Sequence, residues 1–445
     1  MNKQWTLHVE NFGKIGRADV QISPIICFVG DNNSGKSYMM SLLWGILTLG
    51  KEIFPPSPPD SAAYKKCEAW LKDNLNQEAD MDEKTIDLYI QWFNDLLNSR
   101  KKSLLERIFN YPVEASRIEI RDYSRSRKYA VRWEEEGHRF SATETYIKFP
   151  AVNEVSRPIL LRMNAYICWN LLMEGLAAPL FTPVVKGRRQ DEPVYLPASR
   201  TGFMLTFPQL VDQSIQLSFT PALQENTSAL TLPYVDFLQL ITKFETKHSP
   251  NTRESWAINF IQENITHGKL TAKKEGLPTI TYQPEHLEHS LPLYVSSSIV
   301  SEVSPIALLF QSGIVFKTLI IEEPEAHLHP ALQKQMARLI INLANKGVTT
   351  WITTHSDTIL QHMNSMIALK KHPRAKELAQ QFSYTDDDLL SKKDISMYQF
   401  STNIQGTTDF EQLNCTERGF VVPTFNDALA SIVEEVYAFQ EDTDD

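Results

Sequence analysis

The chain has 445 residues, which is enough to bury a large hydrophobic core and to form two or three structural units. Its composition, 42% hydrophobic and 22% charged, is typical of a globular protein. The formal net charge of -10 argues against a surface coated in positive charge for nucleic acid, although it leaves room for a local basic patch. The four cysteines stand far apart, so we expect buried thiols in a reducing compartment.

No membrane association is expected from the sequence. Residues 1–10 do not have the pattern of a signal peptide. The two most apolar segments, 159–181 and 305–321, are interrupted by polar and charged residues, so neither predicts a membrane span of about 20 apolar residues. We therefore expect a cytoplasmic protein.

A phosphate-binding loop is predicted near the start of the chain. Residues 25–29 form an apolar run typical of a buried strand, and residues 38–49 predict a helix that ends at Gly50. The sequence between them fits G-x-x-x-x-G-K-[ST], in the strand–turn–helix context that this motif needs. Converging backbone N–H groups and the helix dipole favour a bound phosphate. The predicted nucleotide-binding residues are Gly30, Asn32, Asn33, Ser34, Gly35, Lys36 and Ser37.

The middle of the chain alternates between helical and strand-like patterns. A proline-rich break at 55–59 precedes a helical tract at 61–110, and strands are predicted within 113–149. Further helical tracts cover 152–180 and 232–266, and residues 270–282 predict a hairpin that turns at Glu275-Gly276.

A second half of the site is predicted around residue 320. Residues 318–321 form a buried strand that ends in Glu322-Glu323, at the strand end where nucleotide chemistry occurs in α/β sheets. In this position Glu322 would hold Mg2+ together with Ser37, and Glu323 would polarise the attacking water. A solvated acidic turn is the alternative interpretation. The next buried strand, 348–352, leads to His355, which could contact a γ-phosphate or could simply bond to backbone at the edge of the core.

Other polar clusters give weaker indications. His327 and His329 lack a third ligand for a metal, and a loop at a subunit interface is favoured instead. Ser297 and Ser298 precede a helix and could donate to an anion, although spacing alone favours an ordinary N-cap.

The long separation between the two half-sites predicts one nucleotide-binding core that is split by insertions. The domain division that we expect is a core at 1–50, 191–210 and 268–445, an inserted helical and strand-containing region at 51–190, and a second helical insertion at 211–267.

These motifs together resemble a known family, the ABC-type ATPases of the overcoming-lysogenization-defect and SMC/Rad50-like branch. More narrowly, the chain is similar to the AAA-15/AAA-21 group found in bacterial anti-phage defence systems. The resemblance covers both ends of the chain and is weak at 51–190 and 205–265. Its carrying segments are 11–15, 30–37, 195–200, 297–298, 322–330 and 354–356.

The resemblance implies an α/β P-loop NTPase fold of ABC type, with a split core and a large, mostly helical insertion that forms an arm or lid. It also implies an Mg2+-dependent ATPase with ATP and Mg2+ as cofactors. Glu322 matches the Walker B carboxylate, Glu323 the catalytic glutamate and His355 the switch histidine. Ser297 and Ser298 match the signature segment, which in this family reaches the ATP of the other subunit. Ile299 stands where a glycine is usual, which implies slow or conditional hydrolysis.

The partners implied are a second copy, in a homodimer or higher homo-oligomer, and a separate effector protein, for which a nuclease is a candidate. No nuclease activity is assigned to this chain, because residues 386–388 are expected to form a solvated acidic loop without flanking strands. Nucleic acid could bind along either of two basic clusters, Arg117–Arg132 (Arg117, Arg121, Arg125, Arg127, Lys128 and Arg132) or Lys186–Arg189. A mixed-charge solvated hairpin is the slightly favoured interpretation of both.

The sequence thus predicts a switch ATPase that dimerises around nucleotide and controls an effector, in anti-phage defence. An SMC/Rad50-like DNA-processing ATPase is one alternative, although the inserted helical tracts are too short and interrupted for long coiled coils. A nucleotide-stabilised scaffold with little turnover is a second alternative, and a transporter ATPase is a weaker third.

Overall fold

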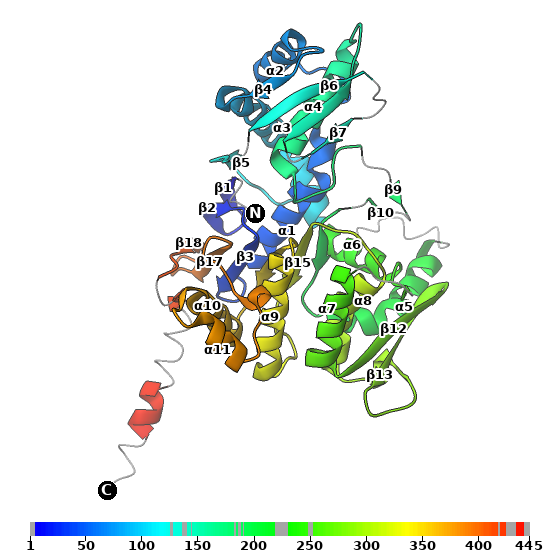
Figure 1. Ribbon diagram of the computed structural model, residues 1–445, viewed down its shortest axis with the longest axis vertical. Helices are drawn as coiled ribbons and strands as arrows, with labels where there is room; N and C mark the ends of the chain where they lie inside the picture. Colours follow the sequence, from blue (N-terminus) through cyan, green and yellow to red (C-terminus); the bar gives the residue numbers. More distant parts are fainter. Residues whose placement is uncertain are drawn as a thin grey trace.

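The structure is a computed structural model that describes residues 5–124, 128–135, 140–143, 145–181, 184–185, 188–189, 191–218, 230–247, 252–416, 419–423 and 433–439. It is an α/β protein built on a nine-stranded sheet (Figure 1). In sheet order the strands are β11 (Val194–Leu196), β15 (Thr318–Glu322), β16 (Thr349–Thr353), β3 (Ile25–Gly30), β17 (Ile395–Thr402), β18 (Thr408–Leu413), β2 (Ile15–Gln21), β1 (Thr6–Phe12) and β5 (Arg117–Arg121).

The parallel half of this sheet is the most deeply buried part. Strands β11, β15, β16, β3 and β17 run parallel to one another, whereas β18, β1 and β5 pair antiparallel with their neighbours β17, β2 and β1. Every residue of β3, β15 and β16 is buried, as expected for parallel strands covered on both faces. Strands from both ends of the chain therefore meet in one sheet.

Alternating side chains divide the core into two layers. In β3, Ile26 and Phe28 face one layer, and Ile25, Cys27 and Val29 face the other. The first layer contains α1 (Lys36–Leu49), α2 (Ala62–Asp73), α3 (Glu83–Phe109) and α4 (Arg157–Met173). The second contains α5 (Arg200–Ser218), α6 (Leu232–Ile241), α7 (Thr252–Ile261), α8 (Ser298–Gln311), α9 (Pro330–Asn345) and α10 (Asp357–Lys371).

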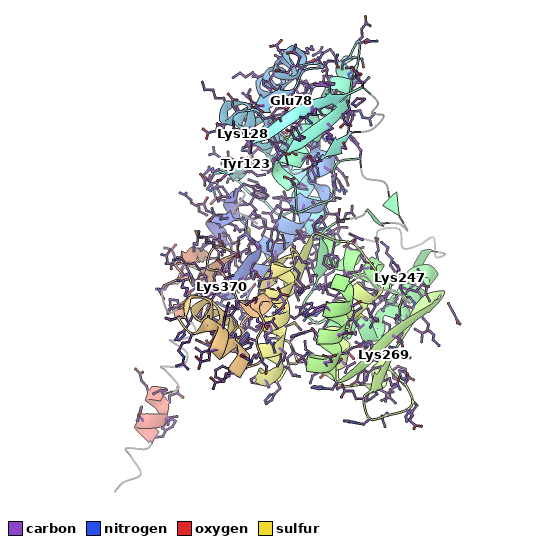
Figure 2. The ribbon with its side chains drawn as sticks, in the orientation of Figure 1. Glu78, Tyr123, Lys128, Lys247, Lys269 and Lys370 are labelled. Carbon is purple, nitrogen blue, oxygen red and sulfur yellow. The ribbon has the colours of Figure 1, made fainter. Side chains whose placement is uncertain are left out.

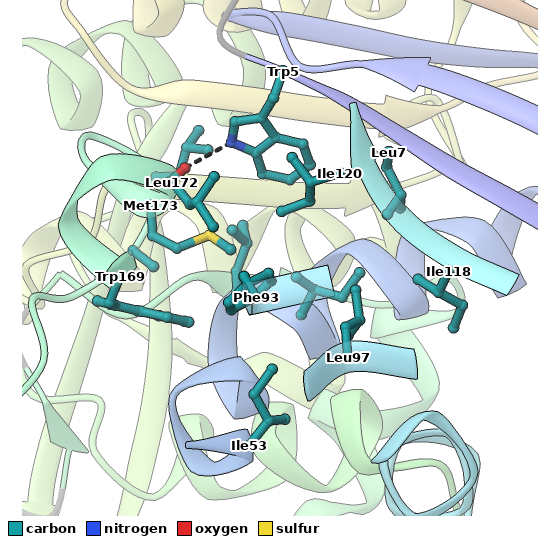
Figure 3. Packing of buried hydrophobic residues seen from close by; sticks show 14 of the residues in the cluster. Trp5, Leu7, Ile53, Phe93, Leu97, Ile118, Ile120, Trp169, Leu172 and Met173 are labelled. Atoms are coloured by element: carbon teal, nitrogen blue, oxygen red, sulfur yellow. Dashed lines mark hydrogen bonds between the residues drawn. The ribbon is translucent and has the colours of Figure 1, made fainter. Parts of the chain in front are cut away.

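The first layer continues upward into a lobe that carries its own small sheet (Figure 1). This sheet has the order β4 (Ala79–Met81), β6 (Tyr129–Glu134), β8 (Tyr146–Pro150) and β7 (Ser141–Ala142). Figure 3 shows the buried hydrophobic residues that pack between the lobe and the main sheet, where the Trp5 indole donates to the Leu172 carbonyl at 2.6 Å. Gly45 of α1 lets α3 approach, because a Cβ there would lie 2.1 Å from the Ile108 side chain.

The second layer carries the predicted hairpin. It consists of β12 (Gly268–Glu275) and β13 (Leu277–Pro284), which turn at Gly276, and β13 also pairs with the short β14 (Leu291–Pro292). The remaining short elements are β9 (Val184–Val185), β10 (Arg188–Arg189), α11 (Ala375–Gln381), helical turns at Gly50–Ile53, Gln262–Thr266, Leu293–Val295 and Asp386–Asp388, and a helix at 433–439.

Two expectations from the sequence are wrong. All four cysteines were expected to be buried, but Cys415 is only half-buried, whereas Cys27, Cys67 and Cys168 are buried. Residues 386–388 were expected to form a solvated loop, but Asp388 is only 1% exposed. Its carboxylate accepts hydrogen bonds from Arg338 at 3.0 Å and from Asn342 at 2.9 Å, both on α9. The polar stretch therefore fastens α9 to the segment that leads into β17, a partnership that the local sequence does not reveal.

Candidate functional site

The predicted phosphate loop leaves β3 through three residues with positive φ: Gly30 (φ 117°), Asn33 (φ 58°) and Gly35 (φ 98°). Glycine and asparagine are the residues that adopt this conformation most easily. Gly30 also has no room for a side chain, because a Cβ there would lie 2.0 Å from the Phe400 carbonyl oxygen of β17. The turn therefore depends both on the backbone freedom of glycine and on the closeness of β17.

The hairpin β17–β18 holds this loop from outside. The Asp31 N–H donates to the Phe400 carbonyl at 2.9 Å, and the Asp31 carboxylate accepts from the Thr402 N–H at 2.8 Å. The Thr408 hydroxyl donates to the Ser34 carbonyl at 2.8 Å. Residues near 400 thus fix a loop near residue 30, a contact that no local sequence pattern indicates.

Lys36 lies buried beside the carbonyl groups of its own loop. Its ammonium donates to Gly30 O at 3.1 Å and to Asp31 O at 2.5 Å. Burial lowers the pKa of Lys36 to about 8, although the nearby carboxylates of Glu323 and Asp31 favour the charged form. The lysine therefore remains mostly cationic at neutral pH, but its pKa lies only about one unit above that pH.

A pocket of about 410 Å³ lies over the loop and is lined by three groups of residues. The loop supplies the first group, the ends of β15 and β16 supply the second, and the turn between β1 and β2 supplies the third. The lining residues are Phe12, Gly13, Lys14, Ile15, Asn32, Asn33, Ser34, Gly35, Lys36, Ser37, Tyr38, Glu323, Thr353 and His355. The structure thus places Glu323 and His355 around the same cavity as the predicted loop residues, apart from Gly30.

The β1–β2 turn is a part of the pocket to which sequence reasoning gave no role. Residues 11–15 entered only as one of the segments that carry the family resemblance. Phe12 packs near Tyr38, with ring centroids 6.2 Å apart, and Tyr38 stacks on Phe109 at 4.8 Å. An aromatic wall therefore borders the pocket where the loop passes into α1.

Glu323 reaches the pocket through an unusual backbone conformation. Its φ is 43°, which is uncommon for a residue with a long side chain. The Glu323 N–H donates to the Thr353 carbonyl at 2.9 Å, and this bond ties the end of β15 to the end of β16. The backbone is thereby held in a turn that presents the carboxylate to the cavity.

Glu322 occupies a different environment from its neighbour. It is 1% exposed and does not line the pocket. Its Oε2 accepts hydrogen bonds from the Ala198 N–H at 3.0 Å and the Tyr234 hydroxyl at 3.2 Å. No donor among the described residues reaches its Oε1. A buried carboxylate oxygen without a donor is chemically suited to a hard cation such as Mg2+, which binds through oxygen ligands.

His355 follows β16 and is half-buried beside Lys36. Burial, with a smaller contribution from the Lys36 charge, lowers the pKa of His355 below its usual value, which favours a neutral imidazole at pH 7. The His355 backbone N–H donates to Glu325 Oε1 at 2.6 Å, and burial raises the pKa of Glu325. Glu325 is a residue of the acidic run to which the sequence gave no role, and its position fixes the loop that carries His355.

Ser297 and Ser298 lie apart from this pocket. Ser297 is the N-cap residue of α8, but its side chain makes no capping hydrogen bond. Both serines are exposed, and the preceding Tyr294 and Val295 are 75% and 57% exposed. Within one chain, the structure therefore brings together Lys36, Glu323 and His355 and leaves the serines on a separate surface.

The basic clusters are largely neutralised where the structure describes them. Arg117 and Arg121 both pair with Glu119, at 3.3 and 2.9 Å, and Arg132 pairs with Glu78 at 2.8 Å. Figure 2 labels Glu78 and Lys128 in the upper lobe. Arg125, Arg127, Lys186 and Gly187 lie outside the described residues, as do the side chains of Arg188 and Arg189. The described pairs favour the mixed-charge interpretation over a path for nucleic acid.

No metal centre of histidine, cysteine and carboxylate ligands is found among the described residues. The His329 side chain instead accepts a hydrogen bond from the Ala331 N–H and caps α9. In the described part of the chain, no helix is long and apolar enough to cross a lipid bilayer.

Comparison with known proteins gives one extended family match. A family model described as AAA ATPase domain matches residues 5–360. None of the curated proteins matches the sequence.

Several solved structures are similar over most of their length, at low identity. An Smc head bound to the C-winged helix domain of ScpA is 13% identical, covering 92% of this chain and 97% of its own, with a TM-score of 0.37. A second structure is an Smc head domain with an extended coiled coil, bound to the C-terminal domain of ScpA derived from Pyrococcus furiosus. It is 12% identical, covering 98% of this chain and 100% of its own, with a TM-score of 0.37. The SMC head domain from Thermotoga maritima is 10% identical, covering 93% of this chain and 100% of its own, with a TM-score of 0.34.

Proposed function

The chain belongs to the AAA ATPase domain family, and we propose that it is a switch ATPase that dimerises around ATP and controls a separate effector. The observation that carries this proposal is the pocket that collects Lys36, Glu323 and His355. Lys36 begins α1 after the loop that follows β3, and Glu323 and His355 follow the parallel strands β15 and β16, although the three residues are far apart in the sequence. A cation, a carboxylate and a neutral imidazole around one cavity suit the transfer of a phosphoryl group to water.

Nucleotide binding would rest on the phosphate loop. The backbone N–H groups of the loop and the N-terminus of α1 would cradle the phosphates, and Lys36 would add a positive charge beside them. Ser37 and Glu322 are the residues that would hold Mg2+, which would neutralise negative charge on the phosphates. The free Oε1 of Glu322 supports this assignment.

Hydrolysis would rest on Glu323 and His355. The Glu323 carboxylate is the base available in the pocket to orient a water and accept its proton. A neutral His355 can donate one ring N–H to a phosphate oxygen without adding a fixed charge. Glu323 directly follows β15, and His355 lies two residues after β16, so buried strands position both residues.

Dimerisation is proposed from the position of the serines. Ser297 and Ser298 do not line the pocket of their own chain, so contact with ATP requires the pocket of a second copy. The exposed Tyr294 and Val295 beside them would supply apolar contact area for such a partner. ATP would then lie between two copies and switch the assembly that an effector recognises, in a cytoplasmic anti-phage system.

A scaffold with little turnover is the second candidate. It is favoured by Ile299, which stands beside the serines where a glycine is usual in the resembling family. A branched side chain in the first turn of α8 would restrict close approach to a phosphate. In that case ATP would stabilise the assembly and would be hydrolysed slowly or only when an effector is present.

Substitution of the loop lysine tests the nucleotide site. Lys36→Ala should weaken ATP binding by about tenfold to a hundredfold, because a hydrogen bond to a charged group contributes up to about 3 kcal/mol. Isothermal titration with ATP and Mg2+ measures this change. The matched control is Lys370→Ala, which removes an exposed lysine of α10, labelled in Figure 2. Equal affinities of the two variants would refute the assignment of the loop.

A further inference from the structure

Arg200 occupies the junction between the carboxylate strand and α8. It is the first residue of α5, and it is only 1% exposed. One guanidinium nitrogen, Nη1, donates to Glu322 O at 2.5 Å and to Pro197 O at 2.9 Å. The other, Nη2, donates to Glu323 O at 3.0 Å. Arg200 therefore binds the backbone of both predicted ATPase carboxylates.

The same guanidinium is tied to α8 through Glu302. Arg200 Nη2 pairs with Glu302 Oε1 at 2.6 Å, and Nε donates to the Glu302 carbonyl at 3.3 Å. Glu302 Oε2 accepts from the Thr201 N–H at 2.9 Å and from the Thr201 hydroxyl at 2.7 Å. The Thr201 hydroxyl also lies 3.4 Å from the Ser298 carbonyl. A continuous set of polar contacts thus runs from the first turn of α8 to the end of β15.

The stability of the fold does not by itself account for this pair. Two charges buried to 1% exposure each carry a large desolvation cost, and well-packed apolar residues of similar volume are often at least as stabilising. What the ion pair provides, and an apolar pair would not, is a fixed geometry between two separate elements. The planar guanidinium has five N–H donors in rigid directions, so its position is set by all its acceptors together.

We propose that the Arg200–Glu302 pair is a positioning relay that couples the Ser297–Ser298 turn of α8 to the carboxylates of Glu322 and Glu323. This inference rests on the proposed function of the same site. When a second copy contacts the serine turn, Glu302 fixes Arg200, and Arg200 holds the carbonyls at the end of β15. Arg200 and Glu302 are positioning residues, since neither lines the pocket.

Glu323 is the point at which this relay acts. Its φ of 43° is an uncommon backbone conformation that needs restraint on both sides. The Thr353 carbonyl holds its N–H, and Arg200 holds its carbonyl. Release of one restraint would let the carboxylate turn away from the direction that the pocket requires. Misplacement of a reacting group by about 1 Å is enough to lower a rate about a hundredfold.

The test compares steady-state ATP hydrolysis by full-length variants. Glu302→Gln keeps an acceptor for Thr201 but removes the ion pair, and Arg200→Lys keeps the charge but provides a single ammonium. Both variants should lower kcat by about tenfold to a hundredfold and leave the KM for ATP within about twofold of wild type, because the phosphate loop is untouched. Thr201→Val leaves both buried charges in place and should lower kcat by about threefold to tenfold.

A second buried ion pair provides the matched control. Arg338 and Asp388 are 15% and 2% exposed and join at 3.0 Å, and neither residue lines the pocket. Asp388→Asn should lower the melting temperature as Glu302→Gln does, but it should leave kcat within about twofold of wild type. The relay is overturned if Asp388→Asn lowers kcat as much as Glu302→Gln, or if Glu302→Gln and Thr201→Val both keep the wild-type kcat.

Lys36→Ala separates failure of the relay from failure of the proposed function. If wild type hydrolyses ATP, Lys36→Ala does not, and Glu302→Gln matches wild type, then the relay is wrong and the ATPase assignment stands. If wild type and Lys36→Ala release phosphate at the same background rate, then the ATPase assignment fails and the relay fails with it.

Discussion

The pocket over the phosphate loop and the exposed first turn of α8 differ in how many of their polar groups already have hydrogen-bond partners within one chain. The pocket is lined by the phosphate loop, the ends of β15 and β16 and the β1–β2 turn. Hydrogen bonds to backbone groups hold the loop from the β17–β18 hairpin, the Lys36 ammonium within the loop and the backbone of Glu323 at the end of β15. The serine turn of α8 has an N-cap without a capping bond and two exposed apolar neighbours. A region that is preorganised within the chain suits chemistry, whereas an unfinished one suits contact with another molecule.

Removal of the pocket carboxylate is the strongest way to challenge this contrast. Glu323→Gln should lower the rate of phosphate release by about a hundredfold to ten-thousandfold, the usual contribution of a general base. ATP binding should remain, because the amide is isosteric and the loop is unchanged. Phosphate release and nucleotide titration on one preparation measure both quantities. A normal turnover rate in this variant would remove Glu323 from the chemistry.

The acidity of Lys36 gives a second test on the pocket side. Its pKa lies at about 8 in the folded protein, so the free protein loses the ammonium charge as the pH rises through 8. Bound phosphate favours the charged form, and binding then takes up a proton above that pH. ATP affinity should therefore fall by up to about tenfold per pH unit above pH 8 and be nearly constant between pH 7 and 7.5. An affinity that is flat from pH 7 to 9.5 would contradict a role for this ammonium.

Loosening the contact between the β17–β18 hairpin and the phosphate loop should have the smallest effect on ATP binding. Thr408→Val removes one buried hydrogen bond to the Ser34 carbonyl, at a cost of about 1 kcal/mol, and should weaken ATP binding by a few-fold. Thr407→Val is the matched control, because Thr407 is exposed and bonds only within its own turn. An identical ATP affinity for both variants would show that the loop is rigid without the hairpin.

Much of the core could be predicted from the sequence because its signals are local. The runs before Gly30 and Glu322 are strands, each ends in the polar residues of the pocket, and the hairpin at Gly276 forms as expected. The α/β P-loop fold and the resemblance to the AAA-15 group are confirmed by the structure and by the family match. The domain division stays a prediction, and β5, which lies within 51–190, pairs at the edge of the main sheet.

What the sequence did not reveal depends on partners that are far apart along the chain. The acceptors of Arg200 on Glu302, Glu322 and Glu323 lie more than 100 residues away from it, and the hydrogen bond from Thr408 to Ser34 spans 374 positions. Asp388 was misjudged for the same reason, because its partner Arg338 lies 50 residues earlier in α9. Periodicity and motif spacing describe neighbours along the chain, so tertiary ion pairs and interstrand clamps escape them.

The central claim is that ATP joins two copies of this chain through the serine turn of α8. The most direct measurement is the mass in solution of Glu323→Gln, by light scattering, with and without ATP and Mg2+. A chain of 51.0 kDa should shift from the mass of one copy to that of two when ATP is added. The shift should be absent in a Glu323→Gln chain that also carries Tyr294→Asp and Val295→Asp. A mass that is the same with and without ATP would contradict the account.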